Sequence, residues 1–405
     1  MSLSKTFIVI TNQPLTKHNF IRLGVGSTYK DWKIKYWSIL PIINKKIYQD
    51  YTKEGSRYLK NKDFKEILSY SHLVNEIKKL PNNFFYSNSA GNNFLAIFID
   101  RTFFFLGGKK ISFDYGSEID INFYTLENIK NYFQKYNLLR SIIKVNFMII
   151  DKIVKFFLLK LVSTPIFLRL VFNNNMYQKI KKKIKKDSII KVDSPELELF
   201  LKTKKRKKKS INNILFIDDV VEGSFDYKLG HTQAKDMKSS EYWGPTKDFL
   251  DHVKSHLPKN KILIAAHHRR NKKDIPITGF KFFFDKTSEL IQNSRIVLCH
   301  NSLACQIAVL FKKPIIFVTS YYYQKNHYNS HKLTIELSKA LGSDLIYIGK
   351  NFKKTPSIIK KIKTAKVNVA KYEEYRKRYI QFNDLKIHGR WQNILRNLDN
   401  RSFNF

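Results

Sequence analysis

Two short polar segments between residues 261 and 318 carry the side chains best suited to bind an anion. His267–Arg270 (HHRR) follows one apolar run, and His300–Ser302 (HNS) follows another, just before a segment of helical length. Guanidinium groups form paired hydrogen bonds with phosphate, and an imidazole can bond a phosphate or a sugar hydroxyl. A serine at a helix start lies beside free backbone N–H groups that attract anions. These residue types predict binding of a phosphate-bearing ligand.

The elements around these segments indicate a parallel α/β sheet. Apolar strands are expected at Ile214–Ile217, Ile262–Ala266, Arg295–Cys299 and Pro314–Thr319, and helices at Lys247–His256, Thr287–Gln292 and Leu303–Phe311. Strands that alternate with helices of this length favour a Rossmann-like domain, in which ligands bind outside the carboxyl ends of the strands. Both polar segments lie at such strand ends, so we expect them at one crevice.

Within this crevice His267 and Ser302 are the expected anchors of the ligand. Ser302 has two interpretations of equal weight, because its hydroxyl can cap the helix that follows or contact a phosphate. Asn301 can donate to the same oxygens, and Arg269 and Arg270 can supply bidentate phosphate contacts.

Chemistry at this crevice would also need a group that accepts or donates a proton. The candidates are Asp218 and Asp219 after one strand, His300 after another, and Asp100 at the end of an apolar strand expected at Phe94–Asp100. A carboxylate at a strand end is often only a cap or an ion-pair partner, so each remains one candidate among several. No metal site is expected, because two cysteines, Cys299 and Cys305, give no zinc-ligand spacing.

The first part of the chain predicts a second, modest parallel sheet. Strands are expected at Phe7–Thr11 and Lys35–Leu40, with a helix opening over Phe20–Lys30. Arg22, Gly24 and Gly26 are expected to line the side of the crevice that this part of the chain provides. The Gly-x-Gly pair alone is a weak signal, since no third glycine follows at dinucleotide-binding spacing.

The strong positive charge admits several partners. The chain has 405 residues, with 74 Lys and Arg against 33 Asp and Glu, for a formal net charge of +41. Its richness in Lys, Asn, Ile, Phe and Tyr is typical of an AT-rich genome. We rank this compositional bias first as the source of the positive charge. An anionic membrane surface or an anionic sugar nucleotide ranks second. Nucleic acid ranks last and is not the expected partner.

Three segments raise the question of membrane contact. Arg140, Lys144, Asp151 and Lys155 share one edge of an apolar helical pattern over 138–161. This pattern fits a helix at a domain interface or an interfacial membrane helix equally well. The lysine runs Lys179–Lys186 and Lys202–Lys209 are expected to be solvated segments, with attraction to anionic lipid as the alternative.

The expected location is cytoplasmic. The chain has two cysteines that give no disulfide framework, which fits a reducing compartment. The apolar run near Met1 lacks the length and cleavage site of a signal peptide. No stretch of eighteen uncharged apolar residues predicts a spanning helix. Peripheral attachment to the inner membrane is left open.

The sequence resembles bacterial glycosyltransferases of surface-carbohydrate (capsule and lipopolysaccharide) biosynthesis of the GT-B type. The resemblance rests on IAAHHRR at 264–270 and KTSELIQNSRIVLCHNSLACQIAVLFKKPIIF at 286–317, with weaker likeness at 214–230, Tyr242–Phe249 and 16–40. The family pattern is a strand ending in His-Pro-Arg, a helix with Thr-x-x-Leu, and a strand ending in His-Ser-Ser or His-Ser-Thr. This chain departs from it at His268, which replaces the proline, and at Asn301 and Leu303, which leave Ser302 as the single hydroxyl.

The resemblance implies a GT-B fold, an α/β architecture of two Rossmann-like domains facing across a cleft. We expect an acceptor-side domain at 1–135, a helical and lysine-rich connecting region at 136–210, a nucleotide-sugar-binding domain at 211–370, and a helical tail at 371–405 that crosses back to the first domain. By position, His267 and Ser302 would contact the nucleotide, and Arg269 more weakly.

The implied reaction is metal-independent transfer of a sugar from a nucleotide donor to a glycan or lipid-linked acceptor. A CMP-linked acidic sugar is the favoured donor, and no cofactor is expected beside this substrate. The absence of an Asp-x-Asp motif agrees with a mechanism that needs no metal. Two alternatives remain: a sugar-nucleotide epimerase on the same fold, and a non-catalytic basic protein that binds membrane or nucleic acid.

Overall fold

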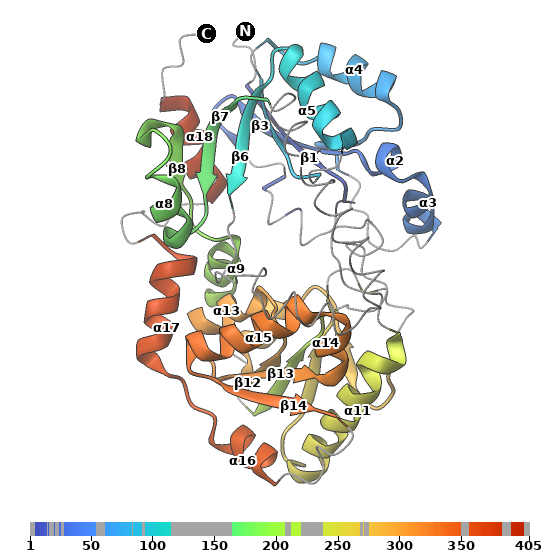
Figure 1. Cartoon of the computed structure of the whole chain (residues 1–405), viewed down its shortest axis with the longest axis vertical. Coiled ribbons are helices and arrows are strands. Elements are labelled where there is room, and N and C mark those ends of the chain that lie inside the picture. The colour runs from blue at the N-terminus through green and yellow to red at the C-terminus, as the bar shows by residue number, and fades with distance from the viewer. Residues whose placement is uncertain are drawn as a thin grey trace, which may run out of the picture.

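Two parallel sheets, each with its own helices, organise the chain. The computed structural model describes residues 5–13, 15, 20, 24–25, 28–53, 61–82, 84–90, 94–114, 164–206, 212–219, 238–267, 270, 275–349, 356–382 and 390–400. Figure 1 shows the two resulting α/β domains one above the other, with the first part of the chain in the upper one. The prediction of two Rossmann-like domains, as in a GT-B fold, is confirmed by the strand orders given below.

The first domain is built on an eight-stranded sheet of the order β2-β3-β1-β5-β6-β7-β8, with β4 also paired to β3. Only the β2–β3 pair is antiparallel among the described strands. The strands are β1 (Thr6–Thr11), β2 (Thr28–Tyr29), β3 (Trp32–Ser38), β4 (Phe64–Glu66), β5 (Phe85–Asn88), β6 (Lys109–Asp114), β7 (Ile166–Val171) and β8 (Ile189–Lys191).

The central strand β1 shows why this sheet is covered on both faces. Side chains alternate between the two faces of a strand. Phe7 and Val9 enter a core that includes the C-terminal helix α18 (Arg390–Asn400), whereas Ile8 and Ile10 enter a core with α4 (Tyr70–Lys78) and α5 (Phe94–Phe105). The strand is therefore buried along its whole length. The remaining described helices of this domain are α2 (Leu40–Ile43), α3 (Lys45–Lys53) and α8 (Asn174–Ile180).

The prediction of a strand at Phe94–Asp100 is wrong, because this segment forms the first part of α5. Its sequence, FLAIFIDRTFFF, is apolar nearly all round, and a short apolar run does not by itself separate a strand from a buried helix. Ala96, Ile99 and Phe103 lie on one helical face and pack on the sheet. Asp100 is consequently a helix residue and does not lie at a strand end.

Two other expectations for this domain are corrected. Where a helix was expected over Phe20–Lys30, Gly24 and Val25 form a turn and β2 follows. The strand expected at Lys35–Leu40 begins earlier, as β3, and ends at Ser38 because Leu40 and Pro41 start α2. Proline suits the first turn of a helix and not a central strand.

The second domain has a six-stranded, wholly parallel sheet of the order β11-β10-β9-β12-β13-β14. Its strands are β9 (Asn213–Ile217), β10 (Ile262–Ala265), β11 (Lys281–Phe283), β12 (Ser294–Cys299), β13 (Ile315–Ser320) and β14 (Asp344–Ile348). Numbered from β9, this is the Rossmann order 3-2-1-4-5-6. The four strands predicted here are confirmed to within one residue at each end, while β11 and β14 were not predicted.

Helices cover both faces of this sheet. They are α11 (Ser239–His256), α12 (Thr287–Gln292), α13 (Ala304–Leu310), α14 (Tyr321–Asn326), α15 (Tyr328–Leu341) and α16 (Ser357–Thr364). The predictions of α12 and α13 are confirmed, and α11 begins eight residues before the predicted Lys247. Among the described helices, none is long and apolar enough to cross a membrane.

The two segments that connect the domains are tied to each other. One leads from β8 into α9 (Pro195–Lys204), which packs on the second domain through Leu197. The other runs through α17 (Val369–Tyr375) and a five-residue π-helix, Arg376–Ile380. The Ser194 N–H donates to the Ile380 carbonyl at 2.9 Å. The Phe382 N–H donates to Asp193 Oδ1 at 3.0 Å, which completes a two-point link.

The domain limits differ from those expected in one respect. Strands β7 and β8 continue the first sheet, although they fall within the stretch expected to be a connecting region at 136–210. The amphipathic segment at 138–161 lies outside the described residues. The run Lys179–Lys186 covers the end of α8 and the turn after it, and Lys202–Lys209 starts in α9 and ends outside the described residues.

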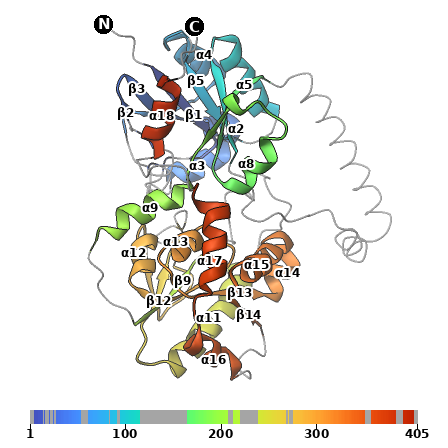
Figure 2. The same ribbon diagram turned by 90° about the vertical axis from the view of Figure 1, so that its left-hand side faces the viewer.

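The C-terminal helix α18 returns to the first domain, as Figure 2 shows from the side. Trp391 packs edge-on against Phe7, with ring centroids 5.7 Å apart. Gly24, in the left-handed region at a φ of 62°, lies against Trp391 so closely that an added Cβ would overlap the indole ring. Gly24, expected at the crevice, is thus required for packing. Arg22 and Gly26 lie outside the described residues.

Candidate functional site

The carboxyl ends of four neighbouring strands meet at one edge of the second sheet. Asp218 and Asp219 follow β9, His267 follows β10, and His300–Ser302 follows β12, whereas β13 ends at Ser320. The chain order reverses between β9 and its neighbour β12. In sheets of this order ligands bind outside the strand ends at that reversal. The fold therefore gathers these residues at the position where a ligand is expected.

Asp218 and Arg270 form a buried two-point ion pair at this edge. Arg270 Nη2 donates to Asp218 Oδ1 at 2.9 Å, and Arg270 Nε donates to Oδ2. The His267 N–H adds a third bond to Oδ2 at 3.2 Å, and the guanidinium lies 5.0 Å from the centre of the Trp243 ring. Both residues are almost inaccessible, at 1% and 5% exposed. This pair holds the turn after β10 against the end of β9.

The ion pair changes the expected roles of both partners. A carboxylate that accepts three hydrogen bonds from its own protein has little capacity left to accept a proton from a substrate. An arginine directed inward onto that carboxylate is likewise not presented to a phosphate. The geometry supports a structural role for Asp218 and Arg270, namely to set the position of His267.

His300 is buried among aromatic rings and is electrically neutral. Its imidazole stacks on Tyr323 at 4.5 Å and meets Phe216 edge-on at 5.6 Å. Nδ1 lies 2.6 Å from the Val318 carbonyl, and because a carbonyl only accepts, Nδ1 carries the proton. Burial lowers the pKa of His300 to about 4, against the opposing effect of this hydrogen bond. A buried imidazole with so low a pKa is a poor base for a sugar hydroxyl and no cation for phosphate.

Asp219 differs from its neighbour because it is partly exposed. The Tyr323 hydroxyl donates to Asp219 Oδ2 at 3.1 Å, and the Asp219 N–H donates to the Tyr242 hydroxyl at 3.2 Å. Two tyrosines thus fix both the backbone and the carboxylate. Of the four residues predicted to be catalytic, Asp219 alone combines partial exposure with a place at the strand reversal.

Ser302 and Asn301 form the turn between β12 and α13. The Ser302 hydroxyl accepts from the Ala304 N–H at 3.3 Å, although the residue at the N-cap position of α13 is Leu303, which makes no side-chain cap. The hydroxyl belongs to a partly exposed residue and retains its own proton for a ligand. Asn301 Oδ1 is buried without a hydrogen-bond partner among the described residues. Such an acceptor is costly to leave unpaired, and a donor group on a ligand would satisfy it.

The remaining predicted residues are less informative. His267 is partly buried, and its carbonyl accepts from the Arg270 N–H at 3.0 Å. Arg269 lies outside the described residues. Asp100 is in the first domain, where it pairs with Lys110 and accepts from the Thr164 hydroxyl at 2.5 Å. It is 5% exposed, and this ion pair explains its burial without a catalytic role.

Three aromatic residues of this edge were missed at the level of the sequence. Tyr242 and Tyr323 bind Asp219, and Trp243 lies against Arg270. Tyr323 could have been found, because it stands just after the predicted strand that neighbours the His300 strand. The pair at 242–243 lies in α11, far from any predicted strand end, so only the weak family likeness at Tyr242–Phe249 pointed to it.

The arrangement offers acid–base and hydrogen-bonding groups, not a metal-ligand set. In the part of the chain that the structure describes, no three His, Cys, Asp or Glu side chains gather as they would around a metal ion. A partly exposed carboxylate, a serine hydroxyl and an unsatisfied amide oxygen can bind a ligand rich in hydroxyl or amine groups. The carboxylate can also take a proton from such a group.

Comparison with known proteins gives likenesses of structure only. No protein-family model and no curated protein matches the sequence. A wall teichoic acid polymerase is 10% identical, with 98% of this chain and 88% of that chain covered and a TM-score of 0.48. UDP-GlcNAc 2-epimerase of Methanocaldococcus jannaschii is 12% identical, with 98% of this chain and 99% of that chain covered and a TM-score of 0.47. A calicheamicin glycosyltransferase is 10% identical, with 98% of this chain and 95% of that chain covered and a TM-score of 0.46.

These solved structures are thus a polymerase, a glycosyltransferase and a UDP-GlcNAc 2-epimerase by name. At such identities and TM-scores they contribute no argument about activity. The assignment of two Rossmann-like domains rests on the strand orders of this chain.

Proposed function

We propose that the protein is a metal-independent glycosyltransferase that holds a nucleotide-sugar donor at the carboxyl edge of the second sheet. The observation that carries the proposal is the position of Asp219, a partly exposed carboxylate at the strand reversal, beside the turn of Asn301 and Ser302. The sequence resemblance at 264–270 and 286–317, which covers the same edge, adds support.

Each residue of the edge has a distinct part in this proposal. The Ser302 hydroxyl and the His267 imidazole bind the donor phosphate, with Arg269 as a further contact. Asn301 Oδ1 accepts from a hydroxyl or amine of the nucleotide or sugar. Asp218, Arg270 and His300 keep the turns in place.

In the transfer step the acceptor hydroxyl oxygen attacks the anomeric carbon of the donor sugar. The bond from that carbon to the phosphate oxygen breaks, and the nucleotide leaves with the electron pair. The hydroxyl proton passes to the Asp219 carboxylate, a step that general-base catalysis of this kind accelerates by about 10²- to 10⁴-fold. The Tyr323 hydroxyl bound to Oδ2 directs the carboxylate during this step.

The proposed donor is a CMP-linked acidic sugar, and the proposed acceptor is a glycan or lipid-linked glycan of the bacterial surface. The resemblance supports both choices, and the net charge of +41 supports anionic substrates in general. The proposed location is cytoplasmic, with peripheral contact to the inner membrane where the lipid-linked acceptor lies.

A thermal-shift panel with CMP, UDP, GDP and their sugar conjugates tests the donor site. One nucleotide is expected to raise the melting temperature of the wild type and to do so less in Ser302→Ala. Ser255→Ala, on the exposed end of α11, is the matched control and keeps the full shift. If no nucleotide stabilises the wild type, the proposal fails.

Product analysis separates the transferase from the epimerase. The stabilising donor is incubated with the protein, with and without acceptor glycans, and the sugars are resolved by chromatography. A transferase releases the nucleotide and extends an acceptor, whereas isomerisation of the donor sugar without release of nucleotide identifies an epimerase and overturns the proposal.

A further inference from the structure

An exposed aromatic surface covers the corner where α4 meets α5 in the first domain. We call it the α4–α5 patch, and it consists of six large apolar side chains. They are Leu68 (60% exposed), Tyr70 (38%), Phe98 (47%), Phe104 (39%), Phe105 (71%) and Leu106 (36%). Single exposed apolar residues are ordinary on a protein surface, whereas several together on one corner mark a contact site.

The patch is continuous on α5. Phe98 and Phe105 are seven residues apart and so share one helical face. The Tyr70 ring lies 5.2 Å from the Phe98 ring, and the Phe104 and Phe105 rings are 6.0 Å apart. The Tyr70 hydroxyl and the Thr102 hydroxyl are 2.8 Å apart, which fixes α4 to α5 at this corner.

A positive charge lies within the patch itself. The Arg101 guanidinium, on the face between Phe98 and Phe105, is 5.5 Å from the centre of the Phe105 ring. Other basic residues on or next to α4, β4 and β6 are Lys65, Lys78, Lys79, Lys109 and Lys110.

The carboxylates of the same segments have hydrogen-bond or ion-pair partners, among them Lys65, Lys79 and Lys110. Glu66 accepts from the Tyr48 hydroxyl at 3.0 Å, and Asp100 and Asp114 pair with Lys110 and Arg169. Glu76 is bound by Lys65 and Lys79, and these hydrogen bonds lower its pKa to about 2. The patch therefore combines aromatic surface with an excess of positive charge.

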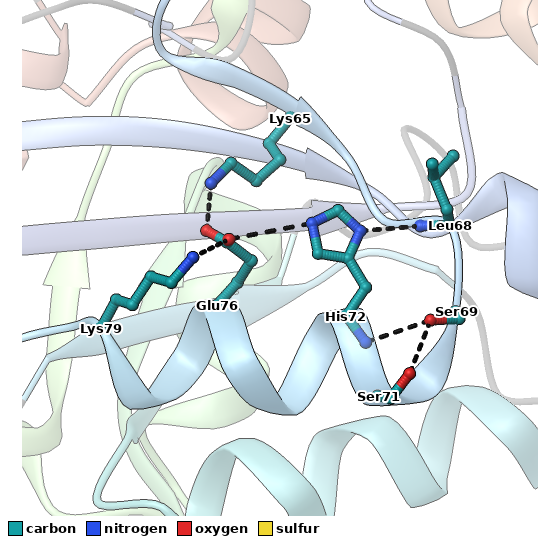
Figure 3. A network of polar contacts seen from close by, with 7 residues as sticks. All are labelled: Lys65, Leu68, Ser69, Ser71, His72, Glu76 and Lys79. Carbon is teal, nitrogen blue, oxygen red and sulfur yellow. Dashed lines mark hydrogen bonds and ion pairs between the residues drawn. The ribbon is translucent and has the colours of Figure 1, made fainter.

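A polar network holds the start of α4 in place (Figure 3). Ser69 caps the helix, because its hydroxyl accepts from the His72 N–H at 3.1 Å. The Leu68 N–H donates in turn to His72 Nδ1 at 3.3 Å. Figure 3 shows the Leu68 side chain directed away from this network. The apolar side chain is thus presented to solvent by a fixed backbone.

We propose that the α4–α5 patch docks the protein on a bilayer surface that contains anionic lipid. Aromatic and aliphatic side chains that enter the headgroup region, with basic side chains around them, are the combination that binds anionic interfaces. The chain has a net charge of +41, which is complementary to the negative charge of lipid phosphate. This favours an anionic lipid surface over a protein of mixed charge as the partner that covers the patch.

The docking proposal does not rest on the glycosyltransferase proposal, because lipid binding requires neither donor nor acceptor.

Co-sedimentation of the full chain with vesicles tests the proposal. The vesicles contain phosphatidylcholine alone or with an equal part of phosphatidylglycerol. We expect binding to the anionic vesicles to be at least about tenfold tighter, and to fall by about tenfold in Phe98→Ser/Phe105→Ser. The control is Ile275→Ser/Val369→Ser, which removes two exposed apolar residues (49% and 58%) of the second domain and keeps the binding.

Three results would overturn the proposal. One is the absence of wild-type binding to anionic vesicles. Another is equal binding by the patch and control variants, which would assign lipid binding to the lysine runs. The third is a wild-type dimer that the patch substitutions dissociate without any lipid effect. An unchanged melting temperature of the patch variant and an unchanged shift with nucleotide show that fold and donor site are intact, so that the two proposals fail separately.

Discussion

Asp218 and Arg270 are 52 positions apart in the sequence and form a buried two-point ion pair at the carboxyl edge of the second sheet. The pair joins the end of β9 to the turn after β10 and binds the His267 N–H as well. Two residues expected to act on a ligand thus act on each other. The neighbouring Asp219 is partly exposed.

Breaking this pair should destabilise the fold. Asp218→Asn leaves the Arg270 charge buried without its counter-ion, and we expect the free energy of unfolding to fall by about 3–5 kcal/mol. Chemical denaturation measures it. Asp219→Asn, one residue on, should cost less than about 1 kcal/mol. Equal losses in the two variants would show that the ion pair has no special structural role.

Asp219→Asn should affect catalysis and spare the fold. The amide keeps the shape of the side chain but cannot accept the proton of an acceptor hydroxyl. Transfer is expected to slow by about 10²- to 10⁴-fold, with the affinity for nucleotide nearly unchanged. Initial rates at saturating donor provide the measurement. A variant with wild-type rates would remove Asp219 from the mechanism.

His300 should make stability depend on pH. Burial lowers its pKa from 6.5 to about 4 in the folded protein, so the unfolded chain binds more protons between these values. The contribution of the neutral ring is therefore complete above pH 6.5 and is lost as the pH falls toward 4. Wild type should lose more stability over this range than His300→Phe in parallel denaturation series. Identical pH dependence in both proteins would contradict the assignment.

The packing of Trp391 should secure the C-terminal helix to the first domain. Trp391 is 3% exposed, and Trp391→Ala is expected to cost about 3–5 kcal/mol of unfolding free energy. Gly24→Ala should cost about 1–3 kcal/mol, because a Cβ there meets the indole ring. Val369→Ala, at a residue 58% exposed, serves as the control with a change of about 0.5 kcal/mol or less. Thermal unfolding of the three variants measures these changes in the free energy of unfolding.

Most of the second sheet was predictable because its central strands can be recognised from the sequence. Runs such as ILFI and IVLC are buried on both faces, apolar throughout and bounded by polar turns. The edge strand β14, DLIYI, has exposed residues at Asp344 and Tyr347, and β11 has only three residues, so neither stood out. In the first domain the uniformly apolar α5 gave no period from which a helix could be recognised.

The location of the candidate site was predictable, and the roles of its residues were not. Strand ends can be read from the sequence, and in a parallel sheet they share one edge. Whether Asp218 meets Arg270, or His300 meets the Val318 carbonyl, depends on how distant turns fold against each other. The difference in burial between two adjacent aspartates, Asp218 at 1% exposed and Asp219 partly exposed, follows from the same folding.

The most direct test of the central claim is calorimetric titration with the nucleotide that gives the largest thermal shift. The claim is that the turn of Asn301 and Ser302 holds this nucleotide. Loss of one hydrogen bond from each residue in Asn301→Ala/Ser302→Ala should weaken binding by about tenfold or more. Ser255→Ala should bind as the wild type does. Equal affinity in all three proteins would contradict the claim and place any nucleotide site elsewhere.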